Sequence, residues 1–294
     1  MKNKSDERKD IVVLGSEGFI GSHLLRYLSK RDYKVHDFTK SRPLFTPDGN
    51  MTVDLNEASD IFWFSSKINP AIAANNPDLV DQEMHYFQSS LNSLRQQNKN
   101  YRIIFPSSGG TIYGESRVPC SEIDSINPVN EYGKYKFAKE QLLRESELQH
   151  VILRISNVFG PNQPIGRGQG VIAEWLTAIK SYGAITLYGE ETITRDFLYI
   201  EDLMTALSKC ILIGRAKQTY NIGSGVGTTL GRVLEVMQDI TGIDFQVKIA
   251  PKRSIDRLAI EIDISLAKIQ LDWAPKFSLS EGIQKVWNSI SISY

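Results

Sequence analysis

The sequence has few cysteines and no net charge, and each lack argues against a class of protein. Its two cysteines, Cys120 and Cys210, lie far apart, which fits two buried thiols in a reducing compartment better than a disulfide framework or a metal site. The 34 basic residues balance the 34 acidic ones, so bulk charge gives no support to nucleic-acid binding.

Long apolar runs are also missing. The sequence contains no stretch of about 18 apolar residues, which is the length that a membrane-spanning helix needs. The charged first ten residues are not followed by the apolar segment of a signal peptide. We therefore expect a cytoplasmic protein that binds no nucleic acid, no membrane and no metal.

Short apolar segments alternate with segments whose apolar residues recur at helical spacing. We expect strands at 11–14, 33–38, 51–55, 61–64, 101–105 and 151–155, and helices at 20–28, 80–97 and 131–147. This alternation predicts a doubly wound parallel α/β sheet with helices on both faces. A Gly- and Pro-rich segment after Gly160 is typical of a domain boundary. We expect a main domain over 1–160 and a smaller α/β domain over 161–294, with about 195–225 returning to the main domain.

A glycine-rich turn joins the first expected strand to the first expected helix. Gly15, Gly18 and Gly21 form the pattern Gly-x-x-Gly-x-x-Gly there. Such a turn lets the backbone approach a pyrophosphate closely, and the free N–H groups at the start of the helix can bind it. A tight turn without a ligand is the alternative. The position between strand and helix favours a dinucleotide site, and so an NAD(P)-binding Rossmann domain.

The choice between NAD and NADP depends on the end of the second strand. Asp37 lies within that strand, whereas Lys40 and Arg42 follow it. A carboxylate there would bind the ribose 2′-OH of NAD, and a basic pair could bind the 2′-phosphate of NADP. We expect either cofactor, with a slight preference for NADP. Asp54 and Leu55, at the end of the expected third strand, are candidates to border the adenine.

A tyrosine and a lysine stand four residues apart in an expected helix. Tyr132 and Lys136 would therefore lie on one face. A phenol has a pKa of about 10, and a nearby ammonium favours its ionised form. Tyr132 could then exchange a proton with a sugar hydroxyl as general acid and base. Ser108 and Thr111, in the segment PSSGGTIYG at the end of the fifth expected strand, could hydrogen-bond the reacting oxygen; a plain Ser/Gly turn is the alternative.

These motifs together resemble the extended short-chain dehydrogenase/reductase family, in particular its nucleotide-sugar epimerases, dehydratases and 4-ketoreductases. The resemblance to UDP-glucose 4-epimerase-like proteins covers nearly the whole chain. Besides the motifs above, it rests on Ser121-Glu122, residues 153–161 (LRISNVFGP), Arg195-Asp196-Phe197, residues 220–223 (YNIG) and Trp273-Ala274-Pro275.

The resemblance implies roles for further residues. Phe19 and Ile20 would offer backbone amides to the cofactor pyrophosphate. Lys136 would bind the nicotinamide ribose. Asn157 would contact the substrate near its diphosphate, and Arg195 and Arg253 would clamp that diphosphate, although an internal ion pair is the alternative for Arg195.

The chain departs from the family pattern at three places. Tyr135 precedes the lysine where relatives usually have a small residue. Counting back from Tyr113 puts Gly109 at the usual catalytic Ser/Thr, whereas counting forward from the strand puts Ser108 there; we prefer Ser108, with Thr111 second. No carboxylate follows this hydroxyl, so we set dehydration aside, because it needs a base beside the ketone.

Three functional hypotheses follow. The first is an NAD(P)-dependent epimerase that acts at C4 of a nucleotide-linked sugar through a 4-keto intermediate. The second is an NADPH-dependent reductase of a nucleotide-linked 4-keto-6-deoxy sugar, and the third is a non-catalytic nucleotide-binding sensor. The resemblance implies a nucleotide-diphosphate sugar as partner, a homodimer, and a product used in polysaccharide biosynthesis.

Overall fold

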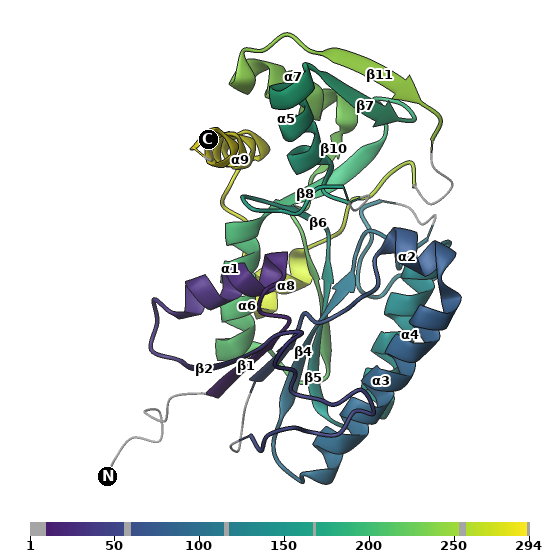
Figure 1. Cartoon of the computed structure of the whole chain (residues 1–294), viewed down its shortest axis with the longest axis vertical. Helices are drawn as coiled ribbons and strands as arrows, with labels where there is room; N and C mark the ends of the chain where they lie inside the picture. The colour runs from purple at the N-terminus through teal and green to yellow at the C-terminus, as the bar shows by residue number, and fades with distance from the viewer. Residues whose placement is uncertain (1–9, 56–59, 115–117, 167–168, 253–256, 293–294) are drawn as a thin grey trace.

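The computed structural model describes residues 10–55, 60–114, 118–166, 169–252 and 257–292. A six-stranded parallel sheet forms its larger part, in the order β2-β1-β3-β4-β5-β9 (Figure 1). The strands are β1 (Asp10–Leu14), β2 (Lys34–Phe38), β3 (Asp60–Trp63), β4 (Arg102–Ser108), β5 (Gln149–Ile155) and β9 (Gln218–Ile222). The order reverses direction between β1 and β3, and the carboxyl ends of strands at such a point are where open α/β sheets bind ligands.

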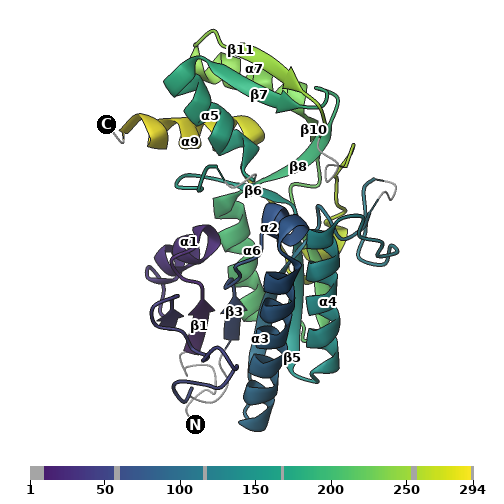
Figure 2. The same ribbon diagram turned by 45° about the vertical axis from the view of Figure 1, so that its right-hand side comes forward.

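Helices cover both faces of this sheet (Figures 1 and 2). One face carries α1 (Phe19–Leu28) and α6 (Ile200–Ile213), and the other carries α3 (Pro77–Gln96) and α4 (Glu131–Glu145), with the short α2 (Pro70–Asn75) before α3. Neighbouring residues of β1 show why consecutive residues of this central strand are apolar. Val13 belongs to the same core cluster as Leu24 of α1, whereas Val12 belongs to the cluster that contains Phe87 of α3.

A smaller α/β lobe stands over the carboxyl edge of the sheet (Figure 1). It contains β6 (Asn157–Phe159), α5 (Val171–Tyr182), β7 (Ala184–Tyr188), β8 (Thr194–Tyr199), β10 (Gly227–Thr229), α7 (Leu230–Thr241), β11 (Gln246–Ala250) and α9 (Leu279–Ile292). Its strands form two small sheets, β10-β8-β6 and β11-β7. The chain between β8 and β10 supplies α6 and β9 to the larger part, and α8 (Ser265–Gln270) contacts β9.

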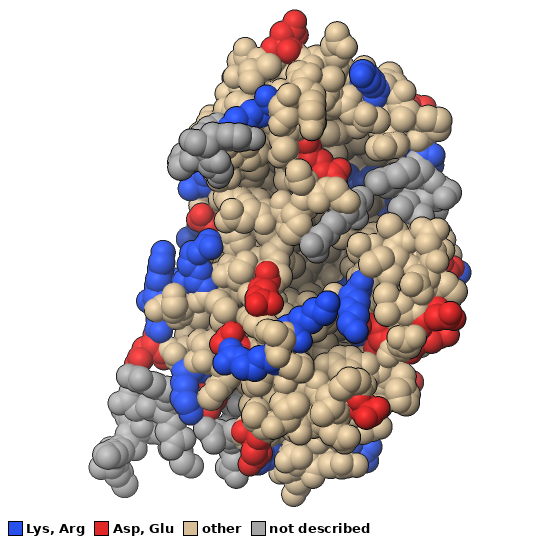
Figure 3. Space-filling view, viewed as in Figure 1, with Lys and Arg blue, Asp and Glu red and all other residues tan. Residues whose placement is uncertain are grey.

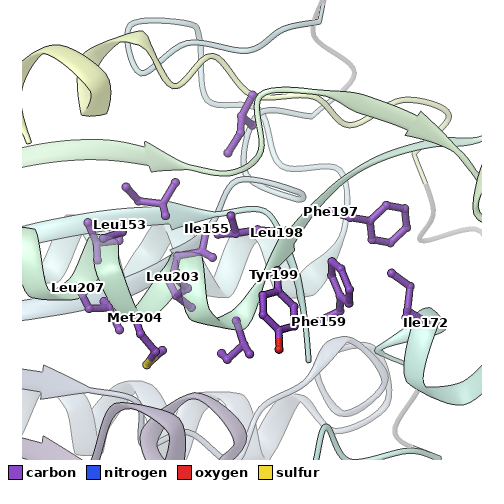
Figure 4. Close-up of a cluster of buried hydrophobic side chains, with 14 of the residues drawn as sticks. Leu153, Ile155, Phe159, Ile172, Phe197, Leu198, Tyr199, Leu203, Met204 and Leu207 are labelled. Carbon is purple, nitrogen blue, oxygen red and sulfur yellow. The ribbon is translucent and has the colours of Figure 1, made fainter. Parts of the chain in front are cut away.

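One apolar cluster spans the junction between the two parts. Figure 4 shows Leu153 and Ile155 of β5 near Leu203 of α6, with Phe159 of β6 and Tyr199 of β8 on the side of the smaller lobe. The Phe159 and Tyr199 rings pack edge to face, with centroids 5.7 Å apart. The two parts therefore share a core, which fixes the position of the smaller lobe above the sheet.

The prediction of a doubly wound parallel sheet is confirmed, but the strand expected at 51–55 is wrong. Met51 forms only an isolated antiparallel bridge with Phe45, and the backbone N–H of Thr52 donates to the carbonyl of Leu44 at 2.8 Å. The reason is packing: the Phe45 ring stacks on Trp63 of β3, with centroids 5.5 Å apart. This contact folds the chain into a turn over the sheet where a further parallel strand was expected.

Candidate active site

A cavity of about 510 Å³ lies at the carboxyl ends of β4 and β5, beneath the smaller lobe. Figure 3 shows the surface hollowed between the two parts, with Lys and Arg side chains close by. The volume is in the range of pockets that bury a small organic ligand. Its wall is formed by both parts of the molecule: by the start of α1, the end of β4 and α4 below, and by β6, α5 and β8 above.

The glycine-rich turn forms one end of this cavity. Gly15 has φ +80°, and a Cβ there would come within 2.8 Å of the Ser65 backbone nitrogen. A Cβ on Gly21 would lie 2.2 Å from the Gly15 carbonyl oxygen. Gly18 caps α1 without a side-chain hydrogen bond, so the N–H groups of the first helical turn remain for a ligand. Gly18, Phe19, Ile20 and Gly21 all line the cavity, and this cradle fits a dinucleotide diphosphate.

An acidic and a basic side chain meet at the end of β2. The Ser16 hydroxyl, in the glycine turn, donates to Asp37 Oδ2 at 3.4 Å. Arg42 Nη2 lies 2.9 Å from Asp37 Oδ1, and Lys40 is exposed. Asp37 therefore contacts the glycine turn through one carboxylate oxygen. Its other carboxylate oxygen forms an ion pair with Arg42. Both residue types needed to read the ribose 2′ position are present.

Asp54 and Leu55 do not join the other cofactor candidates. Lys99 Nζ lies 2.7 Å from Asp54 Oδ1, and the Tyr101 hydroxyl donates to the Leu55 carbonyl at 3.3 Å. Lys99 and Tyr101 precede β4, so this contact lies at the amino edge of the sheet, whereas the glycine turn lies at the carboxyl edge. The expectation that Asp54 and Leu55 border the adenine is therefore wrong, because the turn that replaces the third strand carries them away.

The tyrosine and lysine of the expected pair lie together on the cavity wall. Asn130 caps α4 by accepting the Gly133 N–H, which starts the helix just before Tyr132. Lys136 Nζ lies 5.6 Å from the centre of the Tyr132 ring and donates to the Pro106 carbonyl at 2.9 Å. Burial raises the pKa of Tyr132 to about 12 and lowers the pKa of Lys136 to about 8. The phenol is thus neutral at pH 7, and a further positive charge in the cavity would favour its ionisation.

The hydroxyl segment contributes Ser108 and Thr111 to the same wall. Thr111 Oγ1 is buried and, among the described residues, has no hydrogen-bond partner. A side chain at Gly109 would point the other way, because its Cβ would meet the Arg154 carbonyl at 3.0 Å and Ile262 Cδ1 at 3.1 Å. A hydroxyl at position 109 could therefore not reach the cavity, and Ser108 and Thr111 remain the candidates for the catalytic hydroxyl.

Asn157 and Arg195 line the cavity from the smaller lobe. Asn157 Nδ2 donates to the backbone carbonyl of Asp196 at 3.2 Å. Arg195 Nη1 donates to the backbone carbonyls of Thr194 and Arg257, each at 2.8 Å. Arg195 therefore makes no ion pair with Asp196 within the described structure, and its guanidinium is held at the cavity by main-chain acceptors. Arg253 lies outside the described residues.

Arg257 is a site residue that the sequence analysis missed. It lines the cavity and is only 2% exposed. Its Nε and Nη1 atoms have no hydrogen-bond partner in the described part of the chain. Two buried guanidinium nitrogens without acceptors are costly, so this arrangement fits an anionic ligand. The sequence gives little indication of this role, because an arginine four residues after Arg253 resembles an ordinary surface charge.

Buried polar atoms without partners gather at this cavity. Within the described ranges, the residues that carry them are Trp63, Ser107, Thr111, Ser156, Gln163 and Arg257. All except Trp63 line the cavity. Native proteins leave few such atoms unpaired, and a ligand with several donors and acceptors would satisfy them.

Two expectations from composition concern other parts of the molecule. Cys120 and Cys210 are both buried, and no disulfide joins them. Among the residues with described positions, no helix is long and apolar enough to span a membrane, and no group of three or more His, Cys, Asp or Glu side chains is placed to hold a metal ion.

Comparison with known proteins gives one family and several relatives of similar length. The model of the NAD dependent epimerase/dehydratase family matches residues 11–223. A putative UDP-glucose 4-epimerase of Methanocaldococcus jannaschii is 27% identical over 301 residues, which cover 95% of this chain and 97% of the relative. A dTDP-4-dehydro-6-deoxyglucose reductase of Escherichia coli is 28% identical over 312 residues, which cover 97% and 99%.

Solved structures give the same result for the fold. The UDP-glucose 4-epimerase of Thermotoga maritima, solved with UDP-glucose, has a TM-score of 0.82 at 27% identity and covers 96% of this chain and 98% of its own. The UDP-glucose 4-epimerase of Thermus thermophilus, in complex with NAD, has a TM-score of 0.85 at 24% identity, with 97% and 100% covered. These likenesses extend over both parts of the molecule.

Proposed function

Because the chain belongs to the NAD dependent epimerase/dehydratase family, we propose that it is an NAD(P)-dependent epimerase that acts at C4 of a nucleotide-linked sugar. The observation that carries the proposal is the shared cavity. The glycine turn, the Tyr132–Lys136 pair, two hydroxyls and two arginines all line it. A sensor without catalysis would have no use for a tyrosine, a lysine and a hydroxyl gathered at one wall.

The residues present fit a dinucleotide. The N–H groups around Gly18, Phe19 and Ile20 would bind its diphosphate, with Gly15 and Gly21 allowing the close approach. Lys136 would bind the nicotinamide ribose from the wall opposite. When bound, the cofactor would accept a hydride from C4 of the sugar and return it to the other face of the ring.

Tyr132 moves the proton in this scheme. Its phenolate takes the proton of the C4 hydroxyl, and the resulting phenol gives the proton back after the 4-keto sugar has turned over, so no proton is consumed in a cycle. Lys136 favours the phenolate by its positive charge. Ser108 or Thr111 hydrogen-bonds the reacting oxygen, and the orphaned hydroxyl of Thr111 supports such a role.

The nucleotide diphosphate is held by the arginines of the cavity. Arg195 and Arg257 both line the cavity, and the Arg257 backbone carbonyl accepts from Arg195. Asn157 adds an amide. Binding energy from this remote group places C4 against Tyr132. Arg253 stays a prediction for the same task.

A 4-ketoreductase is the second candidate. The Escherichia coli reductase, at 28% identity over nearly the full length of both chains, supports it, and so do Lys40 and Arg42 near the ribose end of the site. In that reaction Tyr132 donates one proton to the new alkoxide and must be reprotonated in each cycle. That either enzyme works as a homodimer is our prediction from the family resemblance, and a cytoplasmic location is our prediction from the composition.

A panel of nucleotide sugars tests the proposal. The purified protein is incubated with UDP- and dTDP-linked hexoses, and products are separated by anion-exchange chromatography. We expect interconversion of a C4 pair without added reductant. A Tyr132→Phe variant should lose turnover by about 10²-fold or more and still bind NAD(P). Turnover only of 4-keto substrates with NADPH would favour the reductase, and no turnover of any sugar nucleotide would reject both.

A further inference from the structure

A second Tyr-x-x-x-Lys pair overlaps the first in the segment EYGKYKFAK of α4. Tyr135 and Lys139 lie three residues after Tyr132 and Lys136. Lys139 Nζ donates to the Tyr135 hydroxyl at 2.9 Å. Both side chains are buried, at 3% and 1% exposure, and neither lines the cavity. The proposed reaction gives this pair no part.

A carboxylate from α3 and a hydroxyl from the cavity wall complete the cluster. Glu83 is 6% exposed; its Oε1 accepts from the Tyr135 hydroxyl at 3.4 Å and lies 3.5 Å from Lys139 Nζ. The Ser66 hydroxyl lies 3.0 Å from that of Tyr135, and Ser66 lines the cavity. A chain of polar contacts therefore runs from a buried carboxylate to the cavity. Buried ion pairs seldom add net stability, so another role is expected.

The charges around Lys136 show what Glu83 does. Lys136 and Lys139 are two buried ammonium groups one helical turn apart. Glu140, the other nearby carboxylate, already pairs with Arg154 of β5 and Arg144, each at 3.0 Å. Glu83 is thus the described carboxylate left to balance both lysines. The other groups that face the two lysines are the Tyr132 and Tyr135 rings of α4, the Phe87 ring of α3, and the Phe105 ring and Pro106 carbonyl of β4.

Electrostatics agree with this geometry. Burial lowers the pKa of Lys136 to about 8, and Glu83 is the largest influence that raises it again. Burial also lowers the pKa of Lys139 to about 8, where Glu83 opposes the effect and the charge of Lys136 adds to it.

We propose that Glu83, Tyr135 and Lys139 are positioning residues of the catalytic pair. Glu83 supplies the counter-charge that keeps two buried lysines protonated together, and Tyr135 ties this charge cluster to the cavity wall at Ser66. The cluster thereby sets the pH range over which Lys136 carries the positive charge that the proposed function requires.

The direct test is the titration of Lys136 in the folded protein, read from the pH dependence of its side-chain nitrogen resonance in ¹⁵N-lysine-labelled samples and assigned with Lys136→Arg. Glu83→Gln removes a negative charge, so the pKa of Lys136 should fall by about one unit. Lys139→Gln removes a like charge and should raise it. Glu131→Gln, which removes an exposed carboxylate of α4 that pairs with Lys134, is the control and should leave the pKa within about 0.3 units of the wild type.

The opposite signs distinguish a charge effect from a merely structural one. The double variant Glu83→Gln/Lys139→Gln should return the pKa of Lys136 toward its original value. Equal shifts in both single variants, or none, would overturn the inference. If Glu83→Gln does not fold, Lys139→Gln carries the same test with the other sign.

Turnover gives a second readout that rests on the proposed function. A lysine loses its charge as the pH rises through its pKa. The alkaline limb of the pH–rate profile should therefore move to lower pH in Glu83→Gln and to higher pH in Lys139→Gln. If the wild type turns over no nucleotide sugar, the proposed function fails while the titration still decides this inference. If turnover is normal but the limbs and the titration do not move, this inference alone fails.

Discussion

Replacing Arg257 by Met should weaken ligand binding without weakening the fold. In the protein as described, Arg257 Nε and Nη1 are buried and lack acceptors within those residues. Removing two buried N–H donors that lack acceptors avoids their desolvation cost, so the free energy of unfolding should stay level or rise by up to about 3 kcal/mol. A nucleoside diphosphate would supply the missing acceptors. Two charge-assisted bonds at about 1.5 kcal/mol each correspond to a loss of about 100-fold in affinity.

The assay combines urea unfolding with calorimetric titration of UDP and dTDP. Arg195→Met is the matched control, since Arg195 Nη1 already donates to two backbone carbonyls. That variant should lose affinity too, but its free energy of unfolding should fall by about 1–2 kcal/mol. If Arg257→Met destabilises the fold by more than about 1 kcal/mol and leaves both affinities unchanged, Arg257 is a structural residue and the reasoning fails.

Three further substitutions test other parts of the site. Gly21→Ala should destabilise the fold by about 3 kcal/mol and abolish dinucleotide binding, because its Cβ would lie 2.2 Å from a carbonyl oxygen of the turn; thermal denaturation and fluorescence titration check both effects. Arg42→Glu should weaken NADPH binding about 10-fold or more while NADH binding changes less, because the acidic pair with Asp37 repels a 2′-phosphate; equal losses would show that Arg42 does not read that phosphate. Ser108→Ala and Thr111→Val are compared for kcat and cofactor affinity. The variant that removes the hydrogen bond to the reacting oxygen should lower kcat about 10- to 100-fold with little change in cofactor affinity. Thr111→Val should not destabilise the fold.

Local spacing accounts for the features that the sequence analysis predicted well. The glycine turn and the Tyr132–Lys136 pair depend on residues three or four positions apart, where helix geometry decides which side chains share a face. The alternation of apolar strands and helices likewise predicts a parallel sheet, since each βαβ unit is a local structure. These features could be found without knowing which distant segments meet.

Tertiary contacts account for the features it predicted wrongly or missed. Asp54 and Leu55 were placed by assuming a strand, but the stacking of Phe45 on Trp63 turns the chain away. Arg257 was missed because burial of an arginine depends on how the last third of the chain crosses the cavity. Glu83 stands 56 residues from its partner Lys139, so no local pattern connects them.

The measurement that tests the account most directly is to denature the purified protein and identify the released dinucleotide by mass spectrometry, with titration of NADH and NADPH into the undenatured protein alongside. The account predicts a dinucleotide bound in this cavity, and for the epimerase about one NAD⁺ or NADP⁺ per chain retained through purification. An empty protein that binds NADPH more tightly than NADH would favour the ketoreductase. A protein that releases no dinucleotide and binds neither would contradict the central claim.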